Sequence, residues 1–409
     1  MTQTHREANC WKELFWGLYD LLPVEVDRIL SLRQPYVQLL KNLSVPVSIL
    51  RGPTHLEGAE GTVIAAGSER QIIYFIPHFF QEKPNWEGIG DIPLWNLPRR
   101  LKPVRSTADL TVIHTDRLSA RLLFGADYLT VPEWVGSALE VPGDISELSR
   151  GNPGLKSDLR TVSLNNFTSG ITHSDSDFDF FYSNMYVPFT LKRYGEQGKI
   201  ENYYKLRRCS RNGGLLWARQ NEKPVAGGVF QPAGTTLRFL VLGTLDGDWE
   251  IVKRGGIAAL YLFIIKHAKE LGFRFVDFGG SRPSLNDGLL RYKRKWKMKI
   301  VEKEYVYHDF LVYWNRLSDP VLSFLSSSPL IFRDKNGLSA IKTVESDEPI
   351  TQAELEKINR AIAIPGLNRM CLAAAKGWQE GIDGLPKTHL LGASEFRDCN
   401  PSTLFFEEA

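Results

Sequence analysis

The stretch that decides the fold is residues 253–283, which read KRGGIAALYLFIIKHAKELGFRFVDFGGSRP. Gly272 near its middle is typical of a helix end. The apolar run Phe273–Phe278 that follows has the length of a buried strand. Before Gly272, apolar side chains recur at intervals of three and four residues, which is the period of one buried helix face: Ile257, Leu260, Tyr261, Ile264, Ile265, Ala268 and Leu271. The stretch therefore predicts a helix followed directly by a strand.

Three strand-like runs precede this helix, at residues 214–219, 225–230 and 236–243. The short polar segments between them favour hairpin connections. An antiparallel meander followed by a crossover helix and a further strand predicts an α+β domain with a mixed sheet, which we assign to residues 143–314. Aromatic and apolar spacing predicts one more helix in this domain, over Phe178–Tyr194.

The rest of the chain divides into three further parts. Residues 1–43 read as N-terminal helices, and residues 44–142 as a smaller α/β lobe with a proline-rich loop at 81–103. Residues 315–409 read as a helical extension, with a capping box at Thr351–Glu354 and a second helix over Leu367–Trp378. The short strands expected in the smaller lobe are Val45–Leu50, Thr62–Ala66, Ile72–Ile76 and Thr111–His114.

Composition narrows the class of protein. The 409 residues carry a net charge of +3, with 43% hydrophobic and 24% charged residues, as expected for a globular chain and not for a disordered one. The 4 cysteines form no C-x-x-C pair, which argues against a cysteine zinc site and fits a reducing compartment. No apolar run approaches the length of a membrane span. We expect a cytoplasmic protein without a resident metal.

The first candidate site is the turn before the long helix, comprising Lys253, Arg254, Gly255, Gly256 and Ala258. Glycines allow backbone N–H groups to approach an anion, and a helix start carries unpaired N–H donors and about half a positive charge. The pattern indicates a phosphate-binding turn, although a simple connecting turn explains the same residues.

The second candidate follows the predicted strand, where ligands of such sheets collect. Its members are Asp277, Gly279, Gly280, Ser281 and Arg282. Paired glycines favour a positive φ or a close backbone approach. A tight turn capped by Asp277 is the alternative interpretation.

The third candidate is the basic segment after it. Asn286 is a possible helix cap, and six Lys or Arg residues stand between positions 291 and 299. Interleaved with aromatic side chains, such cations are typical of a polyanion contact; the residues assigned to it are Arg291, Arg294, Lys295 and Trp296. His308 follows in a strand-like run and is a candidate proton acceptor.

In this order, the basic turn, the crossover helix, the DFGGSRP segment and NDGLLRYKRKW resemble the core of the GNAT superfamily of N-acetyltransferases. The resemblance covers residues 145–300. Within the superfamily, the chain most resembles the Fem-like peptidyltransferases and the related acetyltransferase-like proteins of polysaccharide and biotin-linked operons. The resemblance implies a mixed sheet splayed at its centre, a construction often duplicated as two tandem lobes.

The resemblance also implies acyl transfer to a small-molecule or peptide amine, without a covalent enzyme intermediate. The donor would be acyl-CoA or an aminoacyl-tRNA. The aromatic–lysine pair of the family falls on Tyr292 and Lys293, so that Lys293 would stabilise the developing oxyanion or contact a donor phosphate. A proton must also be accepted, and the sequence does not choose among Asp277, His308 and the substrate itself. The alternative is a non-catalytic module that binds a nucleotide or RNA on the same fold.

Overall fold

The computed structural model describes residues 43–125, 127–195, 198–303, 307–379, 382, 388–391 and 401. The predicted N-terminal helices lie outside these residues. The chain forms two compact units, each built from separate stretches of sequence. The first contains residues 137–279 and 293–298, and the second contains the rest of the described chain.

The first unit is built on a seven-stranded sheet in the order β12-β6-β11-β10-β9-β8-β7. Strands β7 to β10 are antiparallel neighbours, whereas β11 runs parallel to β10, so the sheet is mixed. Its strands are β6 (Val135–Glu140), β7 (Thr168–Thr172), β8 (Gly214–Gln220), β9 (Lys223–Ala233), β10 (Thr236–Thr244), β11 (Phe275–Ser281) and β12 (Lys299–Val301). The division between the units falls within β6, β11 and α13, and it assigns β12 to the second unit.

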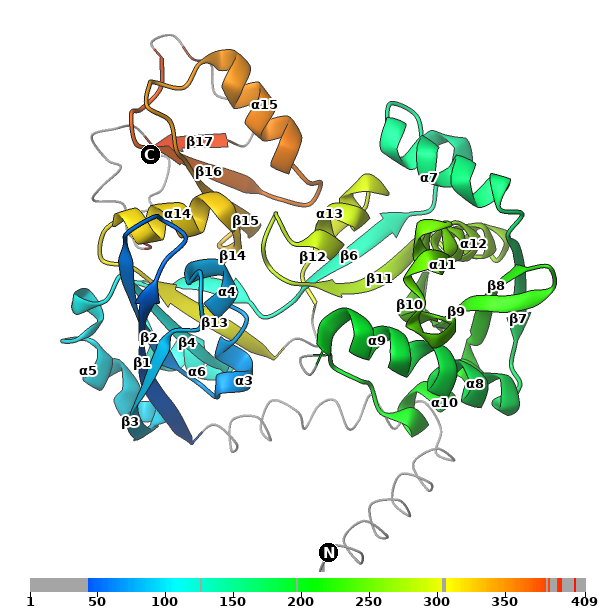
Figure 1. The fold of residues 1–409 in the computed structure, drawn as a ribbon, viewed down its shortest axis with the longest axis horizontal. Helices are drawn as coiled ribbons and strands as arrows, with labels where there is room; N and C mark the ends of the chain where they lie inside the picture. The colour runs from blue at the N-terminus through cyan, green and yellow to red at the C-terminus, as the bar shows by residue number, and fades with distance from the viewer. Residues whose placement is uncertain are drawn as a thin grey trace, which may run out of the picture. The chain divides into compact units, whose positions relative to one another are not determined.

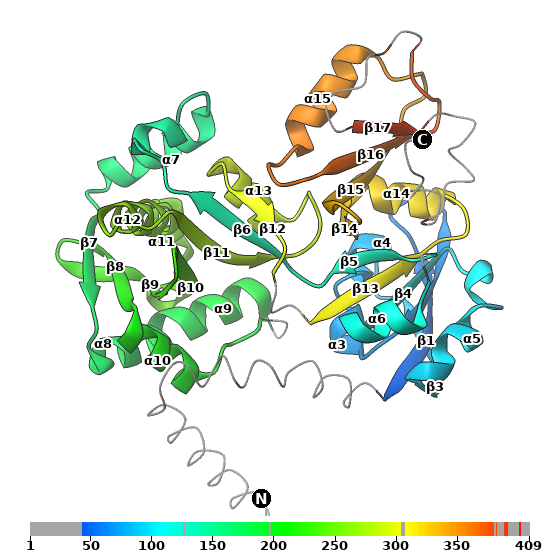
Figure 2. The same ribbon diagram turned by 180° about the vertical axis from the view of Figure 1, so that it is seen from behind.

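Helices cover both faces of this sheet. Helix α12 crosses between the parallel strands and packs against β8, β9 and β10, while α8, α9 and α10 cover the opposite face (Figures 1 and 2). Because α12 packs against both the sheet and α7, ten of its fifteen residues are buried. The helices are η3 (Ile145–Leu148), α7 (Pro153–Leu164), α8 (Asp175–Phe181), a π-turn (Tyr182–Tyr186), α9 (Val187–Tyr194), α10 (Tyr203–Asn212), η6 (Leu245–Gly247), α11 (Trp249–Lys253), α12 (Gly256–Glu270) and α13 (Gly288–Lys295).

The second unit is built on a ten-stranded sheet in the order β17-β16-β15-β14-β5-β13-β4-β2-β1-β3. Strand β13, from late in the chain, lies between β4 and β5 and is antiparallel to both. The strands are β1 (Ser44–Pro53), β2 (Glu60–Ala66), β3 (Asn85–Pro93), β4 (Leu110–Asp116), β5 (Leu129–Pro132), β13 (His308–Tyr313), β14 (Leu330–Asp334), β15 (Gly337–Val344), β16 (Arg369–Ala374) and β17 (Thr388–Leu391). The predicted α+β class with two sheet-bearing lobes is confirmed.

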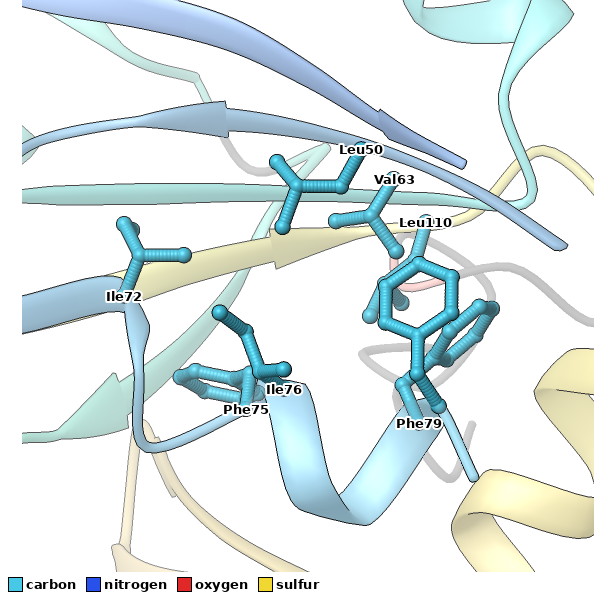
Figure 3. Close-up of a pocket in the computed structure, with 8 residues that line it drawn as sticks. Leu50, Val63, Ile72, Phe75, Ile76, Phe79 and Leu110 are labelled. Carbon is cyan, nitrogen blue, oxygen red and sulfur yellow. The ribbon is translucent and has the colours of Figure 1, made fainter. Parts of the chain in front are cut away.

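Helices also cover this second sheet, and its main core lies beneath α4 and α14. An apolar pocket in that core is lined by Phe75, Phe79 and neighbouring aliphatic side chains (Figure 3). Its volume of about 10 Å³ holds about one water molecule, so it is a packing gap and not a substrate site. The helices are α3 (Glu69–Ile72), α4 (Ile76–Phe79), η1 (Leu94–Asn96), α5 (Leu97–Leu101), η2 (Arg105–Thr107), α6 (Arg117–Leu123), α14 (Asp319–Ser327) and α15 (Gln352–Ile362).

Four predictions are wrong in this unit. The expected strand at Ile72–Ile76 is a junction between two short helices, and the expected loop at 81–103 contains β3 and α5. The expected helix at Leu367–Trp378 contains strand β16, and residues 315–409 supply four strands to the sheet instead of a separate helical extension. Short apolar runs with both faces buried carry no periodicity that separates strand from helix.

Candidate active site

The most distinctive feature of the first unit is the point at which β10 and β11 part. The two strands pair in parallel at three positions only, from Thr236 with Phe275 to Arg238 with Asp277. Both strands continue beyond this point, so Phe239–Thr244 of β10 and Phe278–Gly279 of β11 diverge. We call this divergence the fork. On the other side of β10, the pairing with β9 shifts register between Phe239 and Val241. Such an irregularity bends a strand, and here it lies where the fork opens.

The amino end of α12 lies at the same edge of the sheet, because α12 connects the end of β10 to the start of β11. The helix begins at Gly255, with φ of +96° and no side-chain cap. A Cβ on Gly256 would lie 2.7 Å from Cγ2 of Ile251. Both glycines are therefore required by the tight turn between α11 and α12, and they leave the first N–H groups of α12 without a side-chain acceptor.

The two predicted cations of this turn are exposed. Lys253 forms an ion pair of 2.7 Å with Glu250, and Arg254 is the last residue of the turn before Gly255. Ala258 is buried in the first turn of α12. The positive charge of the turn is thus presented to solvent beside the helix start, as a phosphate-binding turn requires.

At the end of β11, Asp277 and Lys293 hold the backbone of Gly279 from two sides. The Gly279 N–H donates to Oδ1 of Asp277 at 2.8 Å, and φ of Gly279 is +75°. The Lys293 ammonium donates to the Gly279 carbonyl at 3.2 Å, and this side chain is only 1% exposed. The structure therefore gives Lys293 a positioning role at the fork.

Aromatic side chains fill the space between α12 and the two strands. Tyr261 of α12 packs against Phe278 with ring centroids 4.5 Å apart, and Phe239 lies beside both. Trp296 packs on Tyr261 at 5.5 Å and is 0% exposed. The prediction that Trp296 contacts a polyanion is wrong, because its ring belongs to this core.

The basic segment does not form one cationic face. Lys295 forms an ion pair of 2.6 Å with Asp158 of α7. The Lys297 ammonium donates to the carbonyl oxygens of Glu147 and Arg150 at 2.6 and 3.0 Å. Of the predicted polyanion contacts, Arg291 is exposed and Arg294 is half-buried. Several cations of this run therefore hold α13 and its C-terminal turn against α7 and η3.

The remaining residues of the second candidate lie in the other unit. Arg282 stacks on Trp134 and Tyr74, with its guanidinium carbon 4.1 and 4.9 Å from the two ring centroids. Burial lowers the pKa of Arg282, and Glu133 partly opposes this shift. Gly280 packs near Trp134, and Ser281 is fully buried.

The helix cap predicted for this segment is wrong by one residue. Oδ1 of Asp287, and not the Asn286 side chain, accepts the N–H of Leu290 at 2.8 Å. The Asn286 amide instead donates to the Ser327 carbonyl at 2.7 Å. Asn286 thus ties the segment to α14 of the same unit.

Two predicted catalytic residues also lie in the second unit. Tyr292 is half-buried at its boundary, and His308 begins β13. His308 stacks on His114 and lies near Glu133. The first unit alone therefore brings together the α12 turn, the fork, Asp277 and Lys293.

Comparison with known proteins gives structural neighbours only. No protein-family model matches the sequence, and no curated protein sequence matches it. L-PGS from Bacillus licheniformis is 14% identical, covering 68% of this chain and 87% of that chain, with a TM-score of 0.34. FemX is 12% identical, covering 68% and 90%, with a TM-score of 0.35. A GCN5-related N-acetyltransferase from Kribbella flavida is 7% identical, covering 80% and 78%, with a TM-score of 0.27.

Fem-like and GNAT-type acyltransferases are among the neighbours. The resemblance expected from the sequence is thus found among solved structures. At TM-scores no higher than 0.35, these three likenesses transfer no residue roles, and the role of each side chain rests on its own geometry. Within the part of the chain that the structure describes, no helix is long and apolar enough to cross a bilayer.

Proposed function

We propose that the protein is an N-acyltransferase that moves an acyl group from a phosphate-bearing donor to an amine. The observation that carries this proposal is the fork. Beyond Arg238, β10 has no ladder partner in β11, although both strands continue. An extended donor chain with amide groups can pair with this strand edge while its phosphates contact Lys253 and Arg254, the two exposed cations that precede the buried amino end of α12.

We favour acyl-CoA over an aminoacyl-tRNA as the donor. A tRNA requires a broad cationic surface, and the basic segment predicted to provide it has Lys293 buried and Lys295 and Lys297 bonded within the unit. The two exposed cations of the α12 turn suffice for a compact pyrophosphate. A cytoplasmic location stays a prediction, as does a small-molecule or peptide acceptor.

The transfer needs no covalent enzyme intermediate. The neutral amine attacks the thioester carbonyl, the tetrahedral intermediate collapses, the thiolate leaves, and one proton passes from the new amide nitrogen to a base. Holding both reactants together supplies much of the rate. Within the first unit, Asp277 is the carboxylate that we propose for this proton, and Lys293 fixes the Gly279 carbonyl beside it.

Incubation of the purified chain with labelled acetyl-CoA, or with charged tRNA, in a cell extract tests the class of donor. Label is expected in amine products from acetyl-CoA. Label moving from charged tRNA alone would reverse the choice of donor. Saturable binding of either donor without transfer would favour the non-catalytic module.

A charge reversal on α12 tests where the donor binds. We expect Arg254→Glu to raise the donor KM about 5-fold, because it removes roughly 1 kcal/mol of charge attraction at a solvated site, with kcat little changed. Lys266→Glu is the matched control, since Lys266 is exposed on the same helix near its other end. Equal effects of the two variants would place the phosphates elsewhere.

A further inference from the structure

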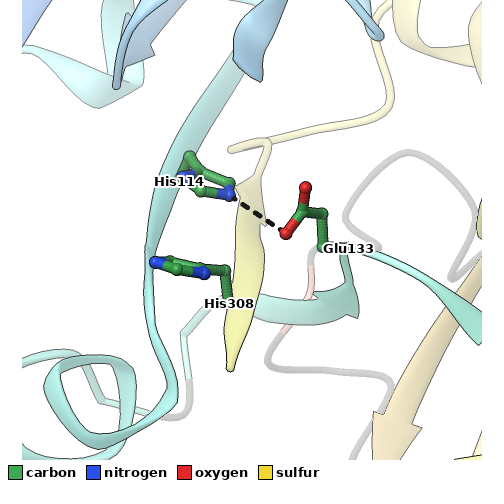
Figure 4. Close-up of side chains that lie close together, drawn as sticks. All are labelled: His114, Glu133 and His308. Carbon is green, nitrogen blue, oxygen red and sulfur yellow. Dashed lines mark ion pairs between the residues drawn. The ribbon is translucent and has the colours of Figure 1, made fainter. Parts of the chain in front are cut away.

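Three side chains that could ligate a metal come together in the second unit, whereas Asp277, Lys293 and the α12 turn belong to the first. His114 lies on β4, His308 on β13 and Glu133 directly after β5 (Figure 4). These three strands are neighbours in the sheet. One potential ligand atom from each side chain lies within 4.8 Å of the other two.

The sheet register explains why these side chains meet. Phe310 is the partner of His114 across β4 and β13, so His308 stands two residues away on the same face. The two imidazoles stack with centroids 4.9 Å apart and planes 15° from parallel. The backbone N–H of Glu133 donates to the His308 carbonyl at 3.3 Å, which holds the Glu133 main chain next to His308.

One nitrogen of the His114 ring is buried and makes no hydrogen bond. The side chain is 2% exposed, and the atom without a hydrogen-bond partner is Nε2. Oε2 of Glu133 faces this nitrogen at 3.8 Å, too far for a hydrogen bond. A buried polar atom of this kind is costly unless something bonds to it.

We propose that His114, Glu133 and His308 bind a divalent first-row transition metal ion, with Zn²⁺ as the representative. Two imidazoles and one carboxylate are a ligand set of catalytic zinc and non-haem iron sites, and they leave a coordination position open. With bonds of about 2.0–2.2 Å and tetrahedral angles, ligand atoms of such a site stand about 3.4 Å apart. Rotations of the three side chains would bring their ligand atoms, now within 4.8 Å of one another, to this spacing.

The surrounding charges are compatible with this occupant. Burial and the neighbouring His114 lower the pKa of His308, which favours the neutral imidazole that a metal requires. Burial alone would raise the pKa of Glu133, but His114, His308 and Arg282 lower it overall, so the carboxylate is ionised.

Other charged side chains near the cluster are occupied elsewhere. Asp116 accepts the N–H and hydroxyl of Ser119, and Asp309 pairs with Arg333 at 2.6 Å. The Arg282 guanidinium stacks on Trp134, which keeps it against an aromatic face beside Glu133. An ion at the cluster would join β4, β13 and the end of β5.

The test uses the full chain after treatment with a chelator. Titration with ZnCl₂ is expected to show one ion bound per chain, and CoCl₂ is expected to give the visible absorption of a low-coordinate site. Glu133→Gln and His308→Ala are each expected to weaken binding at least tenfold. His267→Ala is the matched control, because His267 is also a partly buried histidine, 3.9 Å from Glu270.

Glu133→Gln preserves side-chain size, and circular dichroism checks that each variant is folded. Zn²⁺ is expected to raise the melting temperature of the parent chain and of His267→Ala, but not of Glu133→Gln. Absence of saturable binding to the folded parent chain would overturn the proposal. Equal binding by Glu133→Gln, His308→Ala and the parent would overturn it as well.

Discussion

One substitution separates the observed turn bond of Asp277 from the proton-accepting role that we propose for it. Its Oδ1 accepts the Gly279 N–H at 2.8 Å. In Asp277→Asn the amide oxygen still accepts this bond, but the side chain no longer takes a proton at neutral pH. If Asp277 is the base, kcat falls by a factor of roughly 10²–10⁴ with donor KM little changed. Steady-state kinetics measures both constants, and an unchanged kcat would exclude Asp277.

Trp296 offers a second test at the scale of one residue. Because its ring is fully buried against Tyr261, we expect Trp296→Ala to lower the free energy of unfolding by about 3–5 kcal/mol. Trp296→Phe should cost less, since most of the ring volume remains. Urea denaturation measures the difference. Unchanged stability together with weaker binding of RNA would restore the polyanion interpretation.

Individual residue roles were only partly predictable from the sequence. The bond between Asp277 and the Gly279 N–H agrees with the alternative interpretation of this segment, a tight turn capped by Asp277, which is recognisable because the bond is local in the chain. Spacing did not indicate Glu133 or the His114–His308 pair, because these three side chains come from segments that are far apart in the sequence. The repeated cations near Trp296 looked like one surface, but the fold distributes them between a buried contact, an ion pair and carbonyl groups.

At the scale of elements, one carboxylate of α8 binds two guanidinium groups of α10. Asp175 at the start of α8 accepts bonds from Arg207 at 2.8 Å and from Arg211 at 2.7 and 2.8 Å. These two guanidinium groups hold the pKa of Asp175 well below its usual range, against a smaller opposing effect of burial. The carboxylate therefore stays ionised at any pH at which the chain is ordinarily studied.

The sign of the pH effect follows from this lowered pKa. The pairing stabilises the fold above the unfolded pKa of about 3.9, and its contribution is lost as pH falls through the lower folded pKa. Since Asp175 is partly exposed, we expect Asp175→Asn to cost about 1 kcal/mol or less at pH 7. The difference from the parent, measured by urea unfolding, should be constant from pH 8 to 5 and shrink below about pH 4. A difference that grows on acidification would contradict this assignment.

Elements with strong periodicity were predicted well. The helix expected over 257–271 is α12, and the expected meander is β8 to β10, because one-sided burial leaves a readable repeat. Strand β16 was predicted as a helix. Its residues RMCLAA are buried almost throughout, so the alternation that marks a strand is absent.

At the scale of the whole molecule, the ten-stranded sheet cannot form without the C-terminal third of the chain. Phe310 and Val312 of β13 lie in its main core between β4 and β5. A chain truncated after residue 303 should therefore lose protection from protease over residues 43–136, whereas residues 137–298 should stay resistant. Limited proteolysis with mass spectrometry measures this difference. Equal protection of both stretches would show that β13 is dispensable.

The two-lobe organisation was predictable, but the membership of each lobe was not. Long-range strand pairing depends on which partners bury each other's faces, and one sequence does not record this. The expectation of an independent extension at residues 315–409 is wrong for this reason: β14 pairs with β5, some two hundred residues earlier, and β15, β16 and β17 continue the same sheet from β14.

The late insertion of β13 has a consequence for synthesis on the ribosome. Strand β4 ends at Asp116 and β13 begins at His308, a separation of 308 − 116 = 192 residues. At translation rates of about 5–20 residues per second, the nascent β4 waits roughly 10–40 s for its neighbour. During that interval its unpaired backbone edge and apolar side chains are a natural target for a chaperone, and codon choice within residues 117–307 would tune how long they remain exposed.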